Sequence, residues 1–261
     1  MKVLYYDCFA GISGDMNLGA LIDLGVDLEY IREELEKLNI EEEFSLDISK
    51  EVKQGIGGTK AKVILLNEEH HHHEQDKVAH NHHHRNYKEI KEIINCSSLK
   101  DNVKELAIKI FDEVAKAEGK VHGKNSDEVH FHEVGATDSI VDIVSAALCI
   151  DFLKPDMILA SPIEVGCGMV KCAHGILPVP APATIEILKD VPIIVSGDVD
   201  FEATTPTGAA ILKALCNDFN YEKNFTIKKV GYGLGEKEGK KIPNVLRVIL
   251  AENKDLKKKS I

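Results

Sequence analysis

The chain has 261 residues, of which 44% are hydrophobic and 29% are charged, a composition typical of a folded globular protein. Its net charge of −11 would repel phosphate backbones, so we expect no nucleic acid as its main partner. It has no apolar run long enough to cross a membrane, and its N-terminus lacks the form of a signal peptide, so we expect a cytoplasmic protein without membrane contact.

The N-terminal residues predict a strand, a glycine-containing turn and a helix. The strand covers residues 2–6, and Ser13 is placed to cap a helix that runs from about Asp15 to Leu24. This arrangement suits an anion, and Asp7 and Asp15 are candidates to hold a metal ion or a hydroxyl group. An ordinary strand-to-helix turn explains the same residues, because the chain contains no Walker or Rossmann glycine motif.

The next patterns predict a second helix and a β-hairpin. Gly25 ends the first helix, and Asp27 caps a helix to Leu38 whose apolar residues recur at helical spacing. Residues 44–52 and 59–66 alternate apolar and polar side chains, which is typical of paired strands joined by a turn.

A histidine-rich stretch over residues 68–86 follows the hairpin and has almost no apolar residues, so we expect a mobile loop. Its histidines are His70, His71, His72, His73, His80, His82, His83 and His84. Such tracts bind nickel, copper or zinc with loosely set geometry, and we therefore predict metal capture or storage here. A solvated insertion without function is the alternative.

After this stretch, residues 87–94 predict a short helix and residues 100–119 a long amphipathic one. We expect Gly119 to end the long helix and His122 to lie in a loop. The densest group of reactive side chains comes next, in the segment HFHEVGATDSIVD. Its members are His130, His132, Glu133, Asp138 and Asp142.

In that segment the two histidines share a face of an extended chain, and the two aspartates share a face of a helix that continues as a buried apolar run. Imidazoles and carboxylates are typical ligands of zinc, nickel and copper, so the segment predicts a metal or polar-ligand site. The alternative is a strand end followed by a helix whose acidic first turn favours the helix dipole.

The C-terminal third predicts a strand over residues 157–165 and then a stiff stretch rich in glycine and proline. His174 within that stretch is a plausible third ligand or general acid/base. Further on, Thr205 or Thr207 can cap a helix through Leu215, and hydroxyls and free amides at such a helix start suit a phosphate or carboxylate. An ordinary helix start explains the threonines equally well.

The remaining patterns predict helix 181–188 and strands 192–196, 225–234 and 244–251. We predict an α+β protein of mixed helices and sheet. Its expected parts are an N-terminal α/β segment (1–67), the histidine-rich loop (68–86), a main α+β part (87–252) and a frayed tail (253–261).

Four motifs in this order resemble the LarC family of nickel insertion proteins. They are the segments 7–16 (DCFAGISGDM), 130–142 (HFHEVGATDSIVD), 174–184 (HGILPVPAPAT) and 202–210 (EATTPTGAA). The resemblance implies that the chain inserts nickel into pyridinium-3,5-bisthiocarboxylic acid mononucleotide in a CTP-dependent reaction. The product would be the nickel-pincer cofactor of lactate racemase-type enzymes.

Full members of that family carry a second, C-terminal domain that resembles a module binding CTP and a divalent metal. This chain resembles the N-terminal part alone and ends just after residue 252, where that domain would start. We therefore expect CTP with Mg or Mn to bind only where the C-terminal part is supplied. That separate half of the family is an expected partner, beside a nucleotide-like substrate and a homo-oligomeric copy.

The residue types fit this role. We predict that the histidine-rich loop collects nickel and that a second group, with catalytic and metal-binding members, passes it on: His130, His132, Glu133 and His174. We predict contacts with the substrate from Asp7, Ser13, Asp15, Asp138, Thr205 and Thr207.

Two other functions remain open from the sequence. One is a nickel store or metallochaperone without catalysis, in which the histidine-rich loop is the sole functional part. The other is a metal-dependent hydrolase built on His130 and His132, which would need further histidines on later strands, where only His174 is available. Deleting the loop distinguishes them, because a store would lose all function and an insertion protein would keep some activity at high nickel.

Overall fold

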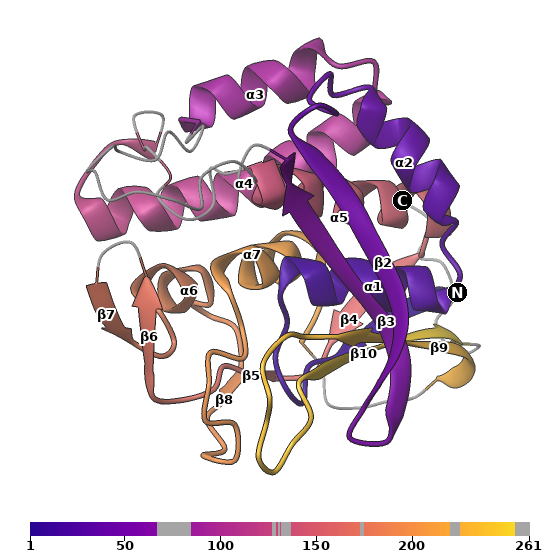
Figure 1. Cartoon of the computed structure of the whole chain (residues 1–261), viewed down its shortest axis with the longest axis vertical. Coiled ribbons are helices and arrows are strands. Elements are labelled where there is room, and N and C mark those ends of the chain that lie inside the picture. The colour runs from indigo at the N-terminus through magenta and orange to yellow at the C-terminus, as the bar shows by residue number, and fades with distance from the viewer. Residues whose placement is uncertain are drawn as a thin grey trace, which may run out of the picture.

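The fold is built around a six-stranded mixed sheet. This computed structural model describes residues 1–66, 85–126, 129, 131, 137–172, 175–219 and 225–253. The strand order is β2-β3-β9-β10-β1-β4. The predicted α+β class is confirmed, and the sheet joins strands from before and after the histidine-rich stretch (Figure 1).

The strands of this sheet are β1 (Lys2–Asp7), β2 (Phe44–Lys53), β3 (Ile56–Leu65), β4 (Met157–Ala160), β9 (Thr226–Leu234) and β10 (Val245–Glu252). Two small sheets pair β5 (Ile163–Glu164) with β8 (Ile193–Ile194), and β6 (Met169–Cys172) with β7 (Gly175–Pro178). Strand β1, next to the edge strand β4, runs antiparallel to β10 and parallel to β4.

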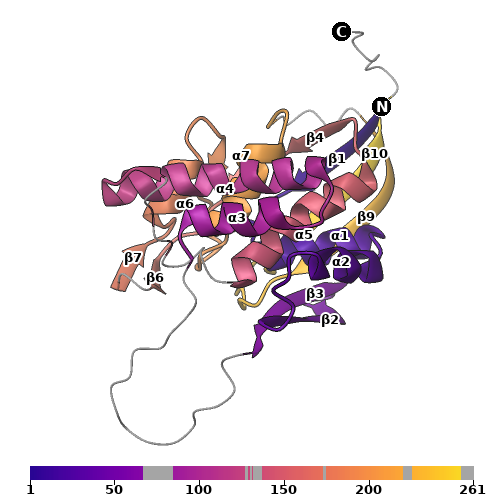
Figure 2. The same cartoon turned by 90° about the horizontal axis from the view of Figure 1, so that it is seen from above.

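The described helices are α1 (Gly14–Leu24), α2 (Leu28–Glu36), α3 (Tyr87–Cys96), α4 (Asp101–His122), α5 (Thr137–Leu153), α6 (Pro182–Ile187) and α7 (Pro206–Leu215). Figure 2 shows α3, α4 and α5 together on one side of the sheet, with the β6–β7 hairpin lying away from it beside α6. Helix α5 is apolar on all sides and buried along nearly its whole length, so it is the central core helix.

The two faces of β1 belong to different cores. Leu4 and Tyr6 pack in the main core with the helices. Val3 and Tyr5 point to the opposite face, where the Tyr5 ring lies 5.3 Å from the ring of Phe225. This alternation follows from the period of two along a strand. The helix-covered face therefore holds most of the buried side chains.

The prediction that Gly119 ends the long helix was wrong. Helix α4 continues to His122, and Gly123 ends it with a φ of 64°. A helix stops where a residue takes the left-handed conformation, which glycine adopts without steric cost. His122 therefore lies on the last helical turn, where its Nε2 is 3.1 Å from the Glu118 carboxylate, and not in a loop.

One other prediction of local structure was wrong. The strand predicted over 157–165 is divided at Ser161–Pro162, because proline has no N–H for a ladder, and the second piece pairs with β8 in another sheet. The stiff stretch after it contains the β6–β7 hairpin. The tip of that hairpin, residues 173 and 174, lies outside the described residues.

Candidate functional site

The loop after β1 brings the starts of two helices into direct contact. Ile12 forms a bridge with Thr204, and the Thr205 N–H donates to the Ile12 carbonyl at 3.1 Å. A side-chain carbon added to Gly208 would lie 2.2 Å from that same carbonyl. Gly11, with a φ of +81°, approaches Ala203 equally closely. The N-terminal turns of α1 and α7 are therefore neighbours.

The predicted caps are confirmed at these two helix starts. The Ser13 hydroxyl accepts the Met16 N–H at 3.2 Å, and the Thr205 hydroxyl accepts the Gly208 N–H at 3.2 Å. Thr207 was the alternative cap. It is instead the second residue of α7 and is 7% exposed. Each capping hydroxyl uses only its lone pairs in the cap and keeps its own proton to donate.

The N-terminal part of α5 meets α1 at the same place. A side-chain carbon on Gly14 would lie 2.0 Å from Oδ2 of Asp142, so only glycine permits this approach. Asp142 is 9% exposed, and its Oδ1 has no hydrogen-bond partner among the described residues. Asn17 follows Gly14 by one helical turn on the same face; it is fully buried, and the described residues offer its amide no partner either.

Three carboxylates influence one another around this contact. Burial raises the pKa of Asp15 to about 6, helped by the charges of Glu236 and Asp138 and opposed by the Val63 N–H and Lys62. Burial also raises the pKa of Asp142 well above its ordinary value, and the charges of Asp15 and Asp138 add to this effect. The Lys62 charge acts on both Asp15 and Glu236, since its Nζ also lies 3.0 Å from the Glu236 carboxylate.

These carboxylates do not by themselves make a metal centre. Across the described ranges, no three side chains of His, Cys, Asp or Glu gather closely enough to hold a metal ion. Asp138, the second residue of α5, accepts the N–H of the adjoining Ser139 at 2.7 Å. What the group offers is a proton-holding site at two helix starts, because a carboxyl with a pKa near neutrality exchanges protons at physiological pH.

Asp7, predicted beside Asp15, has a different environment. Its carboxylate is paired with the Arg247 guanidinium of β10, whose Nε lies 3.0 Å away. The guanidinium carbon lies 5.7 Å from the centroid of the Phe9 ring. The Asp7 carboxylate is therefore held at the carboxyl end of β1 by a partner that the sequence analysis did not identify.

Glu164 is a second residue that the analysis missed. Its carboxylate is 2% exposed and accepts the N–H of Gly166 at 2.9 Å and of Ser196 at 3.1 Å. Its backbone carbonyl accepts the Thr204 hydroxyl at 2.7 Å. In the sequence, a lone glutamate inside an apolar strand could have indicated this residue, because a buried carboxylate needs hydrogen-bond donors around it.

A third missed group, which we call the Glu43 node, consists of Glu43, Arg85 and Thr137. The Glu43 carboxylate is 2.6 Å from the Arg85 guanidinium and accepts the Thr137 hydroxyl at 2.6 Å. The Arg85 guanidinium also donates to that hydroxyl at 3.1 Å, and the Glu43 carbonyl accepts the Leu66 N–H at 2.9 Å. In the sequence, the only indication of this group is that Glu43 and Arg85 are charged residues just before predicted elements.

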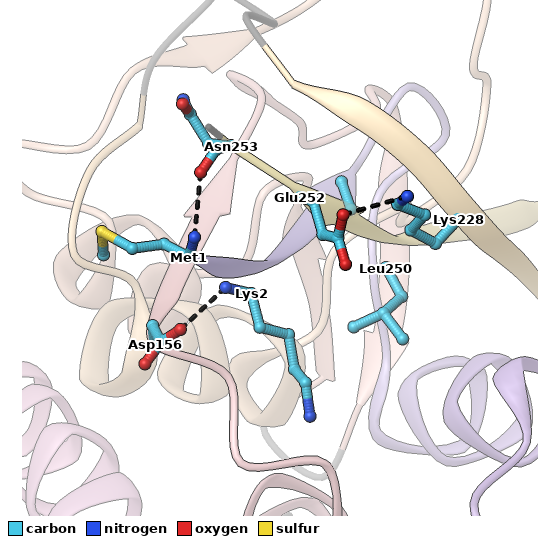
Figure 3. A pocket seen from close by; sticks show the side chains of 8 residues that line it. Met1, Lys2, Asp156, Lys228, Leu250, Glu252 and Asn253 are labelled. Carbon is cyan, nitrogen blue, oxygen red and sulfur yellow. Dashed lines mark hydrogen bonds and ion pairs between the residues drawn. The ribbon is translucent and has the colours of Figure 1, made fainter. Parts of the chain in front are cut away.

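Two surface hollows lie against strands of the main sheet. One of about 480 Å³ is lined by Met1, Lys2, Asp156 and Glu252 at the amino end of β1, whereas the loop to α1 leaves from its carboxyl end (Figure 3). Another of about 260 Å³ lies against Phe225 and Ile227 and also against Arg247, which pairs with Asp7 at the carboxyl end of β1. The first hollow therefore lies at the other end of β1 from the helix starts, whereas the second adjoins the Asp7–Arg247 pair.

A family model described as "Nickel insertion protein" matches residues 4–261. The chain belongs to this family of nickel insertion proteins. Two similar relatives are each named "Pyridinium-3,5-bisthiocarboxylic acid mononucleotide nickel insertion protein". The one from Clostridium kluyveri is 58% identical, covering 97% of this chain and 62% of the relative. The one from Clostridium acetobutylicum is 54% identical, covering 97% of this chain and 64% of the relative.

The chain spans less than two thirds of the length of those relatives. No solved structure matches it. Helices long and apolar enough to cross a membrane are not found in its described part. The family match confirms the predicted family.

The predicted nickel ligands of this family member lie outside the described residues. They are His130, His132, Glu133 and His174, together with the eight histidines of residues 70–84. The described neighbours Val129 and Phe131 are buried, and the Phe131 ring lies 6.0 Å from the ring of Tyr87. The structure therefore places the residues for which we predicted substrate contacts and the described residues that flank the histidine-bearing segments.

Proposed function

We propose that this chain takes part in inserting nickel into pyridinium-3,5-bisthiocarboxylic acid mononucleotide. Its family membership supports the reaction, and the relatives' names supply the substrate. One observation supports this site in particular. Asp142 is buried and its Oδ1 has no partner among the described residues, and it lies near Asp15 where the starts of α1 and α5 meet. Such groups lower stability, and proteins retain them chiefly where function needs them.

The helix starts of α1 and α7 are the proposed site for the phosphate of the mononucleotide. Ser13 and Thr205 lie on adjoining segments because Ile12 pairs with Thr204. The unpaired N–H groups of both helix starts and the two hydroxyl protons are donors suited to a phosphate. Thr207, in the first turn of α7, is a third donor in this proposal.

The carboxylates are the proposed proton acceptors. If nickel binding replaced a hydrogen on the ring of the mononucleotide, that proton would need an acceptor in the site. Asp15, partly exposed and with a pKa raised to about 6, would receive that proton and share it with the buried Asp142 behind it. The charge of Asp138 would help to keep the pKa of Asp142 raised. Asp7 would hold the loop after β1 in place through its pairing with Arg247.

Nickel is the substrate ion in this scheme. We propose that the histidines of residues 70–84 collect it and that His130, His132, Glu133 and His174 pass it to the organic ligand. Imidazole is a preferred ligand of nickel, and exchange among several histidines keeps the ion available. We propose that CTP with Mg or Mn takes part through the C-terminal part of the family, which we propose as partner. We place the reaction in the cytoplasm.

Titration calorimetry of nickel, zinc and cobalt tests the metal steps. The intact chain is compared with a chain lacking residues 68–86. We expect many weak sites to disappear with the deletion and one tight nickel site to remain. Loss of all tight binding would leave the histidine-rich stretch as the only metal site and would favour a nickel store.

An insertion assay tests the reaction itself. The chain is mixed with the mononucleotide, nickel, CTP, Mg and the C-terminal part of a longer relative, and the metallated product is detected by mass spectrometry. We expect product, and we expect the loop-deleted chain to form it only at raised nickel concentrations. Hydrolysis of the mononucleotide without metallation would favour the hydrolase function instead.

A further inference from the structure

Asn244, the residue directly before β10, is a buried side chain that the proposed mechanism does not use. The residue is 4% exposed, and its Oδ1 has no hydrogen-bond partner among the described residues. A buried acceptor without a donor lowers stability, and proteins keep such groups chiefly where they serve function. Asn244 therefore points to a ligand that donates a hydrogen bond.

The pairing of β9 with β10 determines which way Asn244 faces. The Gly235 N–H donates to the Asn244 carbonyl at 2.9 Å, which extends the ladder one pair beyond Leu234 and Val245. Leu246, two residues after Asn244, packs in the main core, so both side chains face the helix-covered side of the sheet. A side-chain carbon on Gly235 would lie 2.3 Å from the Asn244 Nδ2, so this amide packs directly on Gly235.

Two glycines of β9 show how this strand is aligned with α1. A side-chain carbon on Gly231 would lie 2.2 Å from the Ala20 carbonyl, and one on Gly233 would lie 1.8 Å from the Met16 carbonyl. Two residues along the strand therefore correspond to four residues along the helix. This ratio agrees with rises of about 3.3 Å per strand residue and about 1.5 Å per helix residue.

The next step of two strand residues brings Gly235, with Asn244 against it, to the level of Ile12, directly before the first turn of α1. A separate contact agrees with this position. Glu236, the residue after Gly235, lies close enough to Asp15 in that first turn for its charge to help raise the pKa of Asp15. The Asn244 amide therefore lies at the start of α1.

The start of α7 reaches the same place, because a side-chain carbon on Gly208 would lie 2.2 Å from the Ile12 carbonyl. The first-turn N–H groups of both helices and the hydroxyls of Ser13 and Thr205 are hydrogen-bond donors. The Asn244 Oδ1 differs from all of these groups, since it can only accept. The site therefore suits a ligand that accepts hydrogen bonds at one end and donates one beside it.

A mononucleotide has this combination of groups. Its phosphate oxygens accept hydrogen bonds, and the hydroxyls of the adjoining ribose donate them. We propose that Asn244 is a substrate-binding residue whose Oδ1 accepts a hydrogen bond from a ribose hydroxyl, while the helix starts bind the phosphate. This inference rests on the proposed function and names the side chain that recognises the sugar. Phosphate alone would leave Oδ1 unpaired, because a phosphate dianion has no proton to donate.

Binding of deoxy analogues tests this contact. Isothermal titration calorimetry compares pyridinium-3,5-bisthiocarboxylic acid mononucleotide with its 2′-deoxy and 3′-deoxy forms, in the absence of nickel. The proteins are wild type, Asn244→Ala, Gly235→Ala and a control variant. Gly235→Ala keeps the amide of Asn244 but displaces it, since the added carbon would lie 2.3 Å from Nδ2. Thermal unfolding verifies that each variant is folded.

The chain offers a matched control in Asn217, which follows the C-terminal end of α7. The Asn217 Oδ1 accepts the Ile158 N–H at 2.8 Å, so this amide already has the donor that the Asn244 Oδ1 lacks among the described residues. Asn217→Ala removes the same side chain at a position where it serves the fold. We expect it to lower the melting temperature without changing the preference among the three ligands.

We expect wild type and Asn217→Ala to bind one deoxy form about tenfold more weakly than the complete mononucleotide, because the missing hydroxyl leaves Oδ1 unpaired. In Asn244→Ala and Gly235→Ala, that deoxy form and the complete mononucleotide should bind within about twofold of each other.

Equal binding of all three ligands by wild type would overturn the contact, and so would an Asn244→Ala protein that keeps the tenfold preference. In both cases the complete mononucleotide is still bound, so the proposed function stands. Failure of wild type to bind any of the three ligands would contradict the proposed function and overturn this inference with it, which separates the two failures.

Discussion

Glu164 and Asp142 are both buried carboxylates, yet their surroundings differ in kind. Glu164 receives two backbone N–H groups, one on each carboxylate oxygen. Asp142 packs against Gly14, and its Oδ1 has no hydrogen-bond partner among the described residues. A fully hydrogen-bonded buried carboxylate stabilises the segments it joins, whereas an unsatisfied one costs stability. The comparison separates a carboxylate that serves the fold from one that requires a functional explanation.

Removing the satisfied carboxylate should have the largest effect. Glu164→Ala leaves the Gly166 and Ser196 N–H groups without their acceptor. Loss of two hydrogen bonds to a charged group should lower the free energy of unfolding by about 3–5 kcal/mol. Urea unfolding followed by circular dichroism measures this change. A loss below about 1 kcal/mol would remove Glu164 from the structural side of the comparison.

Forcing α1 away from Asp142 should have the next largest effect. Gly14→Ala places a methyl group 2.0 Å from Asp142 Oδ2, and overpacking of this kind costs about 1–3 kcal/mol. Gly57→Ala is the matched control, because a side-chain carbon there meets no atom within 4 Å. Thermal unfolding of both variants tests the contact. Equal melting temperatures would mean that the two helices do not pack this closely.

Removing the charge of Asp15, which is largely buried and interacts electrostatically with Asp142, should have the opposite sign. The folded-state pKa of Asp15 is raised to about 6 from an ordinary 3.8, so the folded protein holds the proton more tightly than the unfolded chain. Stability therefore falls as the pH rises from about 4 to 6 and stays low above that range. Asp15→Asn should gain roughly 2 kcal/mol at pH 8 and almost nothing at pH 4.

Unfolding of that variant in urea at both pH values checks the sign. A loss of stability at pH 8 would show that Asp15 serves the fold in the way that Glu164 does. The Val63 N–H that bonds Asp15 is not a complication, because the asparagine carbonyl can accept the same hydrogen bond.

The smallest effect is expected at Lys62. Its charge lowers the pKa of Asp15, and its pairing with Glu236 is about half exposed on both sides. Lys62→Met should therefore change the free energy of unfolding by less than about 1 kcal/mol. It should also move the pH midpoint of the Asp15 titration, measured by carboxyl NMR, upward. A downward movement would contradict the proposed electrostatics.

Local chemistry made part of this site predictable. Ser13 and Thr205 cap their helices because a hydroxyl before a helical run satisfies a free N–H, a rule that needs only neighbouring residues. Asp142 was recognised as costly because it interrupts an apolar helix. The helix end at Gly123 rather than Gly119 was missed, because Gly119 instead lets the residues after the helix approach: a side-chain carbon there would lie 3.0 Å from the Lys124 carbonyl.

Long-range pairing made the rest unpredictable. Glu43, Arg85 and Thr137 are separated by 42 and 52 residues, and nothing within any one segment identifies the other two. Arg247 reaches Asp7 only because β10 lies beside β1 at the opposite end of the chain. Sequence patterns predicted the strands concerned but not their order in the sheet, and that order decides which charges meet.

One pair of measurements on Asp142→Asn tests the central claim most directly, namely nickel insertion rate and melting temperature on the same sample at pH 7.5. We predict that insertion falls at least about 100-fold, as for loss of a proton-transfer group, while the melting temperature stays equal or rises. A melting temperature that falls by many degrees together with the rate would make Asp142 a structural residue. An unchanged rate would contradict its function in insertion.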